Sequence, residues 1–305
     1  IVETLSKIEA LSGSYSCMYA DAYMFLLKEQ YSDAYKIFDW LRKKFEKNKV
    51  APAKEEEFFV ASVGAMAEVC SAKMNTQSGN FDDVTKKVQD ALIELLITLN
   101  DDKQEFAHKG GNINDTLTDS LRNKILTITP GRKHTVTLVL GILGNAYFRS
   151  KQFVESYKCF EFLSEIVDSD DQTAAASLGM GNALIKQKEY AEAVEKLSQS
   201  VERNTQKDKN YQVALFQLGV AHSELGNQTE SVKYLEQAKE LNFLTPKEMQ
   251  ELYYYLAEGY LMLDKLDETF VYMKMYMKTL QQGKVSDELI DILIEGLLPK
   301  IATME

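Results

Sequence analysis

Apolar residues recur at helical spacing along most of this chain. From Thr135 to Thr279 they return at i, i+3, i+4 and i+7, a spacing that places them on one face of a helix. Short turns such as residues 150–152 and 225–227 interrupt the pattern. It therefore predicts successive amphipathic helices that are joined in pairs by short turns.

The helix pairs form an internal repeat. A small residue in the middle of each first helix sets the register, and its copies stand 37, 38 and 38 residues apart at Gly144, Gly181, Gly219 and Ala257. Each second helix carries a large residue at a constant position: Phe160, Leu197, Leu235 and Met273. Small residues let neighbouring helices approach closely, and large residues fill the seam. Because one pair cannot bury its apolar face alone, the pairs must stack.

Three segments carry most of a known signature, and a fourth is a looser copy. They are LGNAYFRSKQFVESYKCF, MGNALIKQKEYAEAVEKL, LGVAHSELGNQTESVKYL and LAEGYLMLDKLDETFVYM. They resemble the tetratricopeptide repeat (TPR), although each unit exceeds the family period of about 34 residues and lacks the usual proline after the second helix. The resemblance implies an all-α fold: a TPR-like α-solenoid of antiparallel helix pairs that form a right-handed superhelix.

The flanking parts of the chain are more divergent. Residues 15–45, with Ala22 at the small position, predict another helix pair, and residues 55–99 predict a weaker one in which Phe81 opens the second helix. Residues 101–116 read as a loop, and Leu117–Ile128 as a helix that ends at Pro130-Gly131. Three regions are expected: an N-terminal helical region with one or two divergent TPR-like pairs (1–130), four consecutive repeats (131–282) and a C-terminal capping helix (283–305).

Composition narrows the classes of partner. The chain has 305 residues and a net charge of −11, which disfavours nucleic acid and anionic lipid and fits a partner that is basic. Three cysteines without CxxC spacing favour a reduced, cytoplasmic setting. No apolar run reaches the roughly 18–20 residues of a membrane span. Because the chain begins at Ile1, we expect a fragment or a processed product.

The sequence contains no recognisable catalytic motif. The histidines His108, His134 and His222 have no motif partners, and His222 occupies a large core position of the repeat, where packing is the expected role. The acidic run from Asp168 to Asp171 lacks the glycine and terminal glutamate of a calcium loop, so a solvated linker is expected. We therefore predict no enzyme, no cofactor and no metal site.

The resemblance implies a binding groove lined by the first helices. In this family an asparagine at the positions of Asn145 and Asn182 bonds the backbone of a bound peptide, for which an amide is suited because it donates and accepts. Helical phase and these positions together predict a concave partner-binding face: Asn145, Phe148, Arg149, Leu178, Asn182, Lys186, Phe216, Gln217, Tyr254, Tyr255 and Glu258. The family's basic carboxylate clamp is incomplete, because Gly141, Val213 and Gln217 stand where basic residues are expected. The alternative is that this aromatic stripe packs against the terminal helix or an adjacent repeat.

The function expected from these features is that of a scaffold or adaptor in a multiprotein complex, which binds a peptide or helix of a partner protein. Two alternatives stay open at this point. One is a chaperone-like binder of an exported or unstable partner. The other is the regulatory helical part of a larger enzyme.

Overall fold

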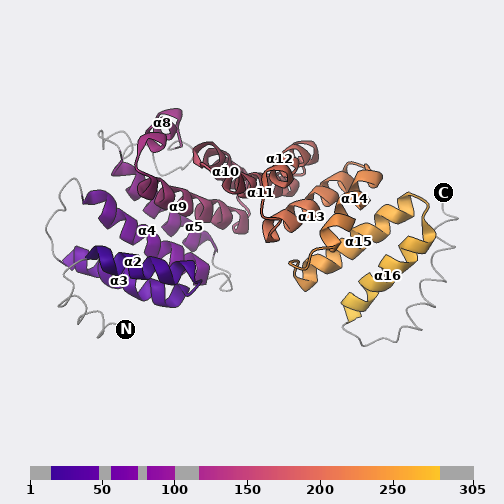
Figure 1. Ribbon diagram of the computed structural model, residues 1–305, viewed down its shortest axis with the longest axis horizontal. Helices are drawn as coiled ribbons and strands as arrows, with labels where there is room; N and C mark the ends of the chain where they lie inside the picture. The colour runs from indigo at the N-terminus through magenta and orange to yellow at the C-terminus, as the bar shows by residue number, and fades with distance from the viewer. Residues whose placement is uncertain (1–14, 48–55, 75–80, 100–116, 282–305) are drawn as a thin grey trace. The chain divides into compact units, whose positions relative to one another are not determined.

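The computed structural model describes residues 15–47, 56–74, 81–99 and 117–281. These residues form thirteen α-helices and no strand (Figure 1), which confirms the all-α class. None of the described helices is long and apolar enough to cross a membrane. The chain divides into two compact units, residues 1–167 and 168–305, and the boundary falls inside the block of predicted repeats, after its first helix pair.

The described residues of unit 1 form three helix pairs and one additional short helix. The helices are α2 (Tyr15–Leu27), α3 (Tyr31–Lys47), α4 (Glu57–Met74), α5 (Phe81–Ile97), α8 (Asp119–Thr127), α9 (Pro130–Arg149) and α10 (Phe153–Ile166). The pairs α2/α3, α4/α5 and α9/α10 pack side by side, α4 and α5 both contact α9, and α8 lies on α10. The segments in which divergent repeats are predicted thus each contain two consecutive helices that pack together.

As far as Gln281, where the described residues end, unit 2 contains three helix pairs in succession. They are α11 (Asp170–Gln187) with α12 (Tyr190–Arg203), α13 (Lys209–Glu224) with α14 (Gln228–Lys239), and α15 (Pro246–Met262) with α16 (Leu266–Gln281). The first helices of consecutive pairs contact one another, α11 with α13 and α13 with α15. We call these first helices, together with α4 and α9 of unit 1, the inner helices.

The predicted contact between small and large residues holds each pair together. A Cβ atom placed on Gly181 would lie 2.5 Å from Cγ of Leu197, and one placed on Gly219 would lie 2.6 Å from Cγ of Leu235. At Gly144 the nearest atom is Cζ of Phe160, at 2.9 Å. These distances are shorter than van der Waals contact, so the glycines are needed for the observed helix separation.

Two predictions about helix ends need correction. α8 (Asp119–Thr127) does end before Pro130, but Pro130 also opens α9, because a proline in the first turn gives up an N–H group that has no partner there. The acidic run is a helix start rather than a linker: the Ser169 side chain accepts from the Gln172 N–H, and Asp171 in the first turn accepts from the Thr205 backbone N–H at 2.8 Å.

Other predicted helix starts agree with the structure. The helix expected at 117–128 is α8, capped by Thr118, and Thr245 forms the predicted capping box with Glu248 at the start of α15. The predicted loop at 101–116 and the predicted capping helix at 283–305 lie outside the described residues.

A polar network fastens α16 to the rest of unit 2. The carboxylate of Glu236 on α14 accepts hydrogen bonds from the hydroxyls of Tyr260 on α15, at 2.9 Å, and Tyr272 on α16. Lys239 pairs with Glu236 and donates to the Tyr272 oxygen at 2.7 Å. The two tyrosine rings lie parallel, 5.5 Å between centroids. One carboxylate therefore joins three helices.

Replacing this carboxylate is expected to produce a pH-dependent loss of stability. Burial works against ionisation of Glu236, but the hydrogen bonds from Lys239, Tyr272 and Tyr260 outweigh it and hold its pKa below the ordinary glutamate value. Glu236→Gln should therefore cost about 1–2 kcal/mol near neutral pH. A lowered pKa contributes stability above the unfolded-state pKa and loses it as pH falls through the folded-state pKa.

The measurement is urea unfolding of the wild type and the variant at a series of pH values. The difference in the free energy of unfolding between wild type and variant should become smaller as pH falls below the ordinary pKa of glutamate. Glu202→Gln removes an exposed carboxylate from α12 and serves as the matched control. A difference in unfolding free energy that stays constant down to acid pH contradicts the stabilising role of the ionised Glu236 carboxylate.

Candidate protein-binding surfaces

The residues predicted to bind a partner are divided between the two units. Asn145, Phe148 and Arg149 belong to α9 of unit 1. The other eight belong to the inner helices of unit 2: Leu178, Asn182, Lys186, Phe216, Gln217, Tyr254, Tyr255 and Glu258. Each group is therefore a surface of its own unit.

In unit 1 the predicted residues border a small pocket between α4, α5 and α9. Its volume is about 160 Å³, which suits one side chain rather than a whole small-molecule ligand. The lining combines apolar groups with one amide and two cations: Ala72, Lys73, Phe81, Val84, Ile142, Asn145, Ala146 and Arg149. The tertiary fold thus places Asn145 and Arg149 beside residues that are more than fifty positions away in sequence.

The polar groups around this pocket are partly engaged within unit 1. The guanidinium of Arg149 lies 5.7 Å from the ring centroid of Phe81, and the Lys73 ammonium lies 5.9 Å from that of Tyr31. The Asn145 side-chain amide donates to the Gly141 carbonyl at 2.9 Å, which leaves its exposed carbonyl oxygen as an acceptor. Phe148 is half-buried against Phe153, with ring centroids 5.5 Å apart, so it offers little free surface.

Two predicted surface residues of unit 2 are in its core. Phe216 is fully buried and Leu178 is 7% exposed. Phe216 shares a hydrophobic cluster with Leu252 and Leu256 of α15, because the next inner helix packs over this repeat position. Neither residue can contact a partner while unit 2 is folded, and for Phe216 the alternative of packing against an adjacent repeat is correct.

The two asparagines do not have equivalent surroundings. Asn145 is exposed, whereas Asn182 is half-buried and its Oδ1 atom is covered without a hydrogen-bond donor among the described residues. A buried acceptor without a hydrogen-bond donor destabilises the folded state. Lys186, one turn further along α11, is exposed, and Gln217 of α13 is half-buried.

The remaining predicted residues form a cluster at one end of unit 2. The side chain of Tyr254 is 45% exposed and its ring meets that of Tyr255 edge-on, with centroids 5.3 Å apart. The Tyr254 hydroxyl donates to Glu258 at 3.5 Å, and the Tyr255 hydroxyl donates to Glu224 at 3.4 Å. Of the column that contains Leu178, Phe216 and Tyr254, only Tyr254 is exposed, since α15 is the last inner helix in the described part of the chain.

Glu224 is the residue that the sequence reasoning missed. It stands five positions after Gly219, in the column that contains Arg149 and Lys186, and a search along that column finds it. The column therefore changes from basic on α9 and α11 to acidic on α13. Lys73 and Phe81 have no such signal, because only the packing of α4 and α5 against α9 brings them to Asn145.

The histidines do not gather into a site among the described residues. His222 is half-buried with its ring stacked on Tyr234 at 5.5 Å, and burial lowers its pKa, so the predicted packing role is confirmed. His134 is exposed and contacts the Tyr23 hydroxyl, and His108 lies outside the described residues. Within the same described ranges, no group of three or more histidine, cysteine and acidic residues is placed to hold a metal ion.

Comparisons with known proteins agree with the repeat pattern. Residues 172–242 match the family model of the tetratricopeptide repeat, a stretch that runs from α11 past the end of α14. No curated protein matches the chain. Among solved structures, the chain is similar to the nearly identical TPR-like repeats of a putative kinesin light chain from Podosopora anserina, with 16% identity, a TM-score of 0.50 and coverage of 74% of this chain and 99% of that one. It is also similar to BtubC (BKLC) from P. vanneervenii, with 11% identity, a TM-score of 0.46 and coverage of 77% and 95%. The first likeness bears on the fold alone.

Proposed function

We propose that this chain, of which residues 172–242 match the tetratricopeptide repeat, is a scaffold or adaptor that binds a peptide or helix of partner proteins on its inner helices. The proposal includes no catalytic activity, cofactor or metal. It places the partner protein against α9 in unit 1 and against α11, α13 and α15 in unit 2.

One observation carries the proposal: the inner helices present polar and aromatic side chains together on the surface of each unit. In unit 1 exposed Asn145 and Arg149 border the same pocket. In unit 2 the half-exposed ring of Tyr254 lies beside Tyr255 and Glu258. Amide and guanidinium groups bond peptide backbone and side chains, and tyrosine adds contact area at a small entropic cost.

Rigid helix pairs make such a surface effective. The inner helices are held by the glycine contacts described above, so their side chains are positioned before a partner arrives. On a pre-organised surface, ordering the side chains at binding costs less free energy. This supports recognition of a short segment by a few residues on each unit.

The test is affinity capture of partner proteins with two inner-helix variants. Asn145→Ala/Arg149→Ala alters unit 1, and Asn182→Ala/Lys186→Ala alters unit 2. For a partner that the wild type retains, at least one variant should weaken binding about tenfold or more, the effect of losing 1.4 kcal/mol or more of contact free energy. Binding strength is then measured with the purified partner by calorimetry.

The matched control is Glu230→Ala/Lys233→Ala, which removes an exposed ion pair from the outer helix α14 without changing the net charge. The control should bind like the wild type. Equal binding by the wild type and both inner-helix variants, or a loss confined to the control, rules out the surfaces around Asn145 and Asn182 as the binding sites.

A further inference from the structure

A cluster of tyrosines and carboxylates on unit 2 has properties that point to a particular kind of partner. We call it the acidic tyrosine site and define it as Tyr190, Glu224, Tyr254, Tyr255 and Glu258. Glu224 ends α13, Tyr190 opens α12, and the other three lie on α15. Contacts between α13 and α15 bring Glu224 to Tyr255 across 31 positions of sequence.

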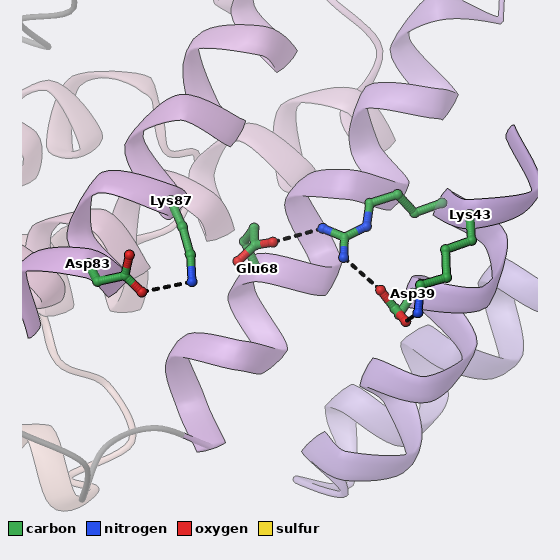
Figure 2. A network of polar contacts seen from close by, with 6 residues as sticks. Asp39, Lys43, Glu68, Asp83 and Lys87 are labelled. Atoms are coloured by element: carbon green, nitrogen blue, oxygen red, sulfur yellow. Dashed lines mark hydrogen bonds and ion pairs between the residues drawn. The ribbon is translucent and has the colours of Figure 1, made fainter. Parts of the chain in front are cut away.

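Within the described residues, the carboxylates of this site have no cationic partner, unlike several carboxylates of unit 1. Figure 2 shows such pairs, in which Lys43 pairs with Asp39 at 2.7 Å, and Lys87 pairs with Asp83 at 2.7 Å. Glu68 likewise binds a guanidinium at 2.9 Å. Neither Glu224 nor Glu258 forms an ion pair with any residue that the structure describes, so these two nearby negative charges have no compensating cation there.

The hydrogen bonds that these carboxylates accept from the tyrosines of α15 are weak. The oxygen–oxygen distances from Tyr254 to Glu258 and from Tyr255 to Glu224 are 3.5 and 3.4 Å, well beyond the usual range of about 2.5–3.0 Å for such bonds. Glu224 also accepts a hydrogen bond from Tyr190. Because Glu224 is exposed and Glu258 is half-buried, lone pairs of both carboxylates stay available to an incoming donor.

The tyrosine rings supply the second half of a cation site. Tyr254 is 45% exposed and meets Tyr255 edge-on, and the ring centroid of Tyr276 on α16 lies 5.8 Å from that of Tyr254. The ring of Tyr254 is therefore held in place by neighbours while part of it faces solvent. A cation over the face of a tyrosine is attracted by the ring quadrupole.

Glu224 and Glu258 make the local electrostatic potential negative, which contributes to raising the pKa of two tyrosine hydroxyls. The carboxylate of Glu258, with burial and Glu224, raises the pKa of Tyr254, and burial together with Glu224 and Glu258 raises the pKa of Tyr255 to about 12. An acidic or phosphorylated ligand is repelled by such a site, and a purely apolar one strips water from the carboxylates without replacing it.

We propose that the acidic tyrosine site binds an arginine side chain in a peptide segment of a partner protein. Arginine fits better than lysine because its planar guanidinium both stacks on an aromatic ring and directs several N–H donors toward carboxylates on two helices. The proposal rests on the proposed function, for which it names the chemistry of the segment that unit 2 binds. It reverses the sign of the family's basic clamp, which reads acidic chain ends.

The test uses two short, blocked alanine peptides that differ only in one central residue, arginine or its neutral isostere citrulline. Each is titrated into the full chain with isotopically labelled tyrosine rings, and binding is followed by NMR. The arginine peptide should bind about tenfold more tightly than the citrulline peptide. The ring signals of Tyr254 and Tyr255 should shift most.

Variants then separate this site from general attraction to an acidic protein. Glu224→Gln/Glu258→Gln should abolish the preference for arginine, and Tyr254→Ala should reduce it. Glu202→Gln/Glu251→Gln removes two exposed glutamates from α12 and α15 and serves as the charge-matched control, which should keep the preference.

Three outcomes overturn the proposal. The two peptides bind equally, the preference survives Glu224→Gln/Glu258→Gln, or the ring signals that shift belong to tyrosines elsewhere. Failure of the proposed function is distinct from these. Partner capture that is insensitive to both inner-helix variants and to Glu224→Gln/Glu258→Gln, while the wild type keeps its preference for the arginine peptide, contradicts the adaptor role and leaves the arginine site standing.

Discussion

Gly181→Ala is expected to lower the free energy of unfolding of unit 2 by about 1–3 kcal/mol, the usual cost of forcing a methyl group into a packed core. The added Cβ would lie 2.5 Å from Cγ and 2.6 Å from Cδ2 of Leu197, which is fully buried. Separation of α11 from α12 or an unfavourable rotamer of Leu197 must relieve the clash. In most helices the same change stabilises, because alanine favours the helix more than glycine does.

The cause can be isolated with a double-mutant cycle. Leu197→Ala alone should cost about 2–5 kcal/mol, since it leaves a cavity between α11 and α12. In the double variant the methyl group of the new alanine occupies part of that cavity, so the combined cost should fall below the sum of the single costs by about 0.5–3 kcal/mol. Urea unfolding, followed by circular dichroism, gives the free energy of unfolding of the wild type, the two single variants and the double variant.

Gly64→Ala is the control for this experiment. Gly64 lies inside α4 and a Cβ atom there meets nothing within 4 Å, so the change should stabilise unit 1 by about 0.5–1 kcal/mol through helix propensity. Equal effects of Gly64→Ala and Gly181→Ala, or additive costs in the cycle, would show that the close contact between Gly181 and Leu197 does not limit packing.

Gln212→Ala is expected to cost about 3 kcal/mol or more in unit 2. Gln212 on α13 is fully buried, and its amide donates to the carbonyls of Ala238, at 2.6 Å, and Leu241, while its oxygen accepts from the Phe243 N–H at 2.6 Å. The variant leaves the Leu241 carbonyl and the Phe243 N–H without this partner, whereas the Ala238 carbonyl still accepts from the Leu241 N–H. Each unsatisfied group costs about 1–3 kcal/mol when buried.

Hydrogen exchange gives this prediction a local readout. The Phe243 amide should lose protection in Gln212→Ala before the centre of α14 does, because only that turn is released. Gln217→Ala, a half-buried position on the same helix, should change stability by no more than about 0.5 kcal/mol. Retained protection of Phe243 in the variant would mean that the turn is held by other contacts.

The candidate surfaces were only partly predictable. Helical phase correctly identified Asn145, Arg149 and Tyr254 as exposed, since the phase of a residue on its own helix follows from its position in the repeat. The same argument failed for Phe216, because its exposure depends on a helix some 35 positions away that packs over it. Helix phase contains no information on which neighbour covers which face.

What the sequence determined by itself is the repeat: its period, its helix pairs and the small and large residues that meet within a pair. These contacts are local, between residues such as Gly181 and Leu197 that are 16 positions apart, and a period in the sequence is enough to align them. The tertiary structure alone decided which polar groups are satisfied. Gln212 finds its partners only because the turn after α14 lies against α13, and Glu224 meets Tyr255 only because α15 stacks on α13. Both contacts join groups that share no periodic relation in the chain.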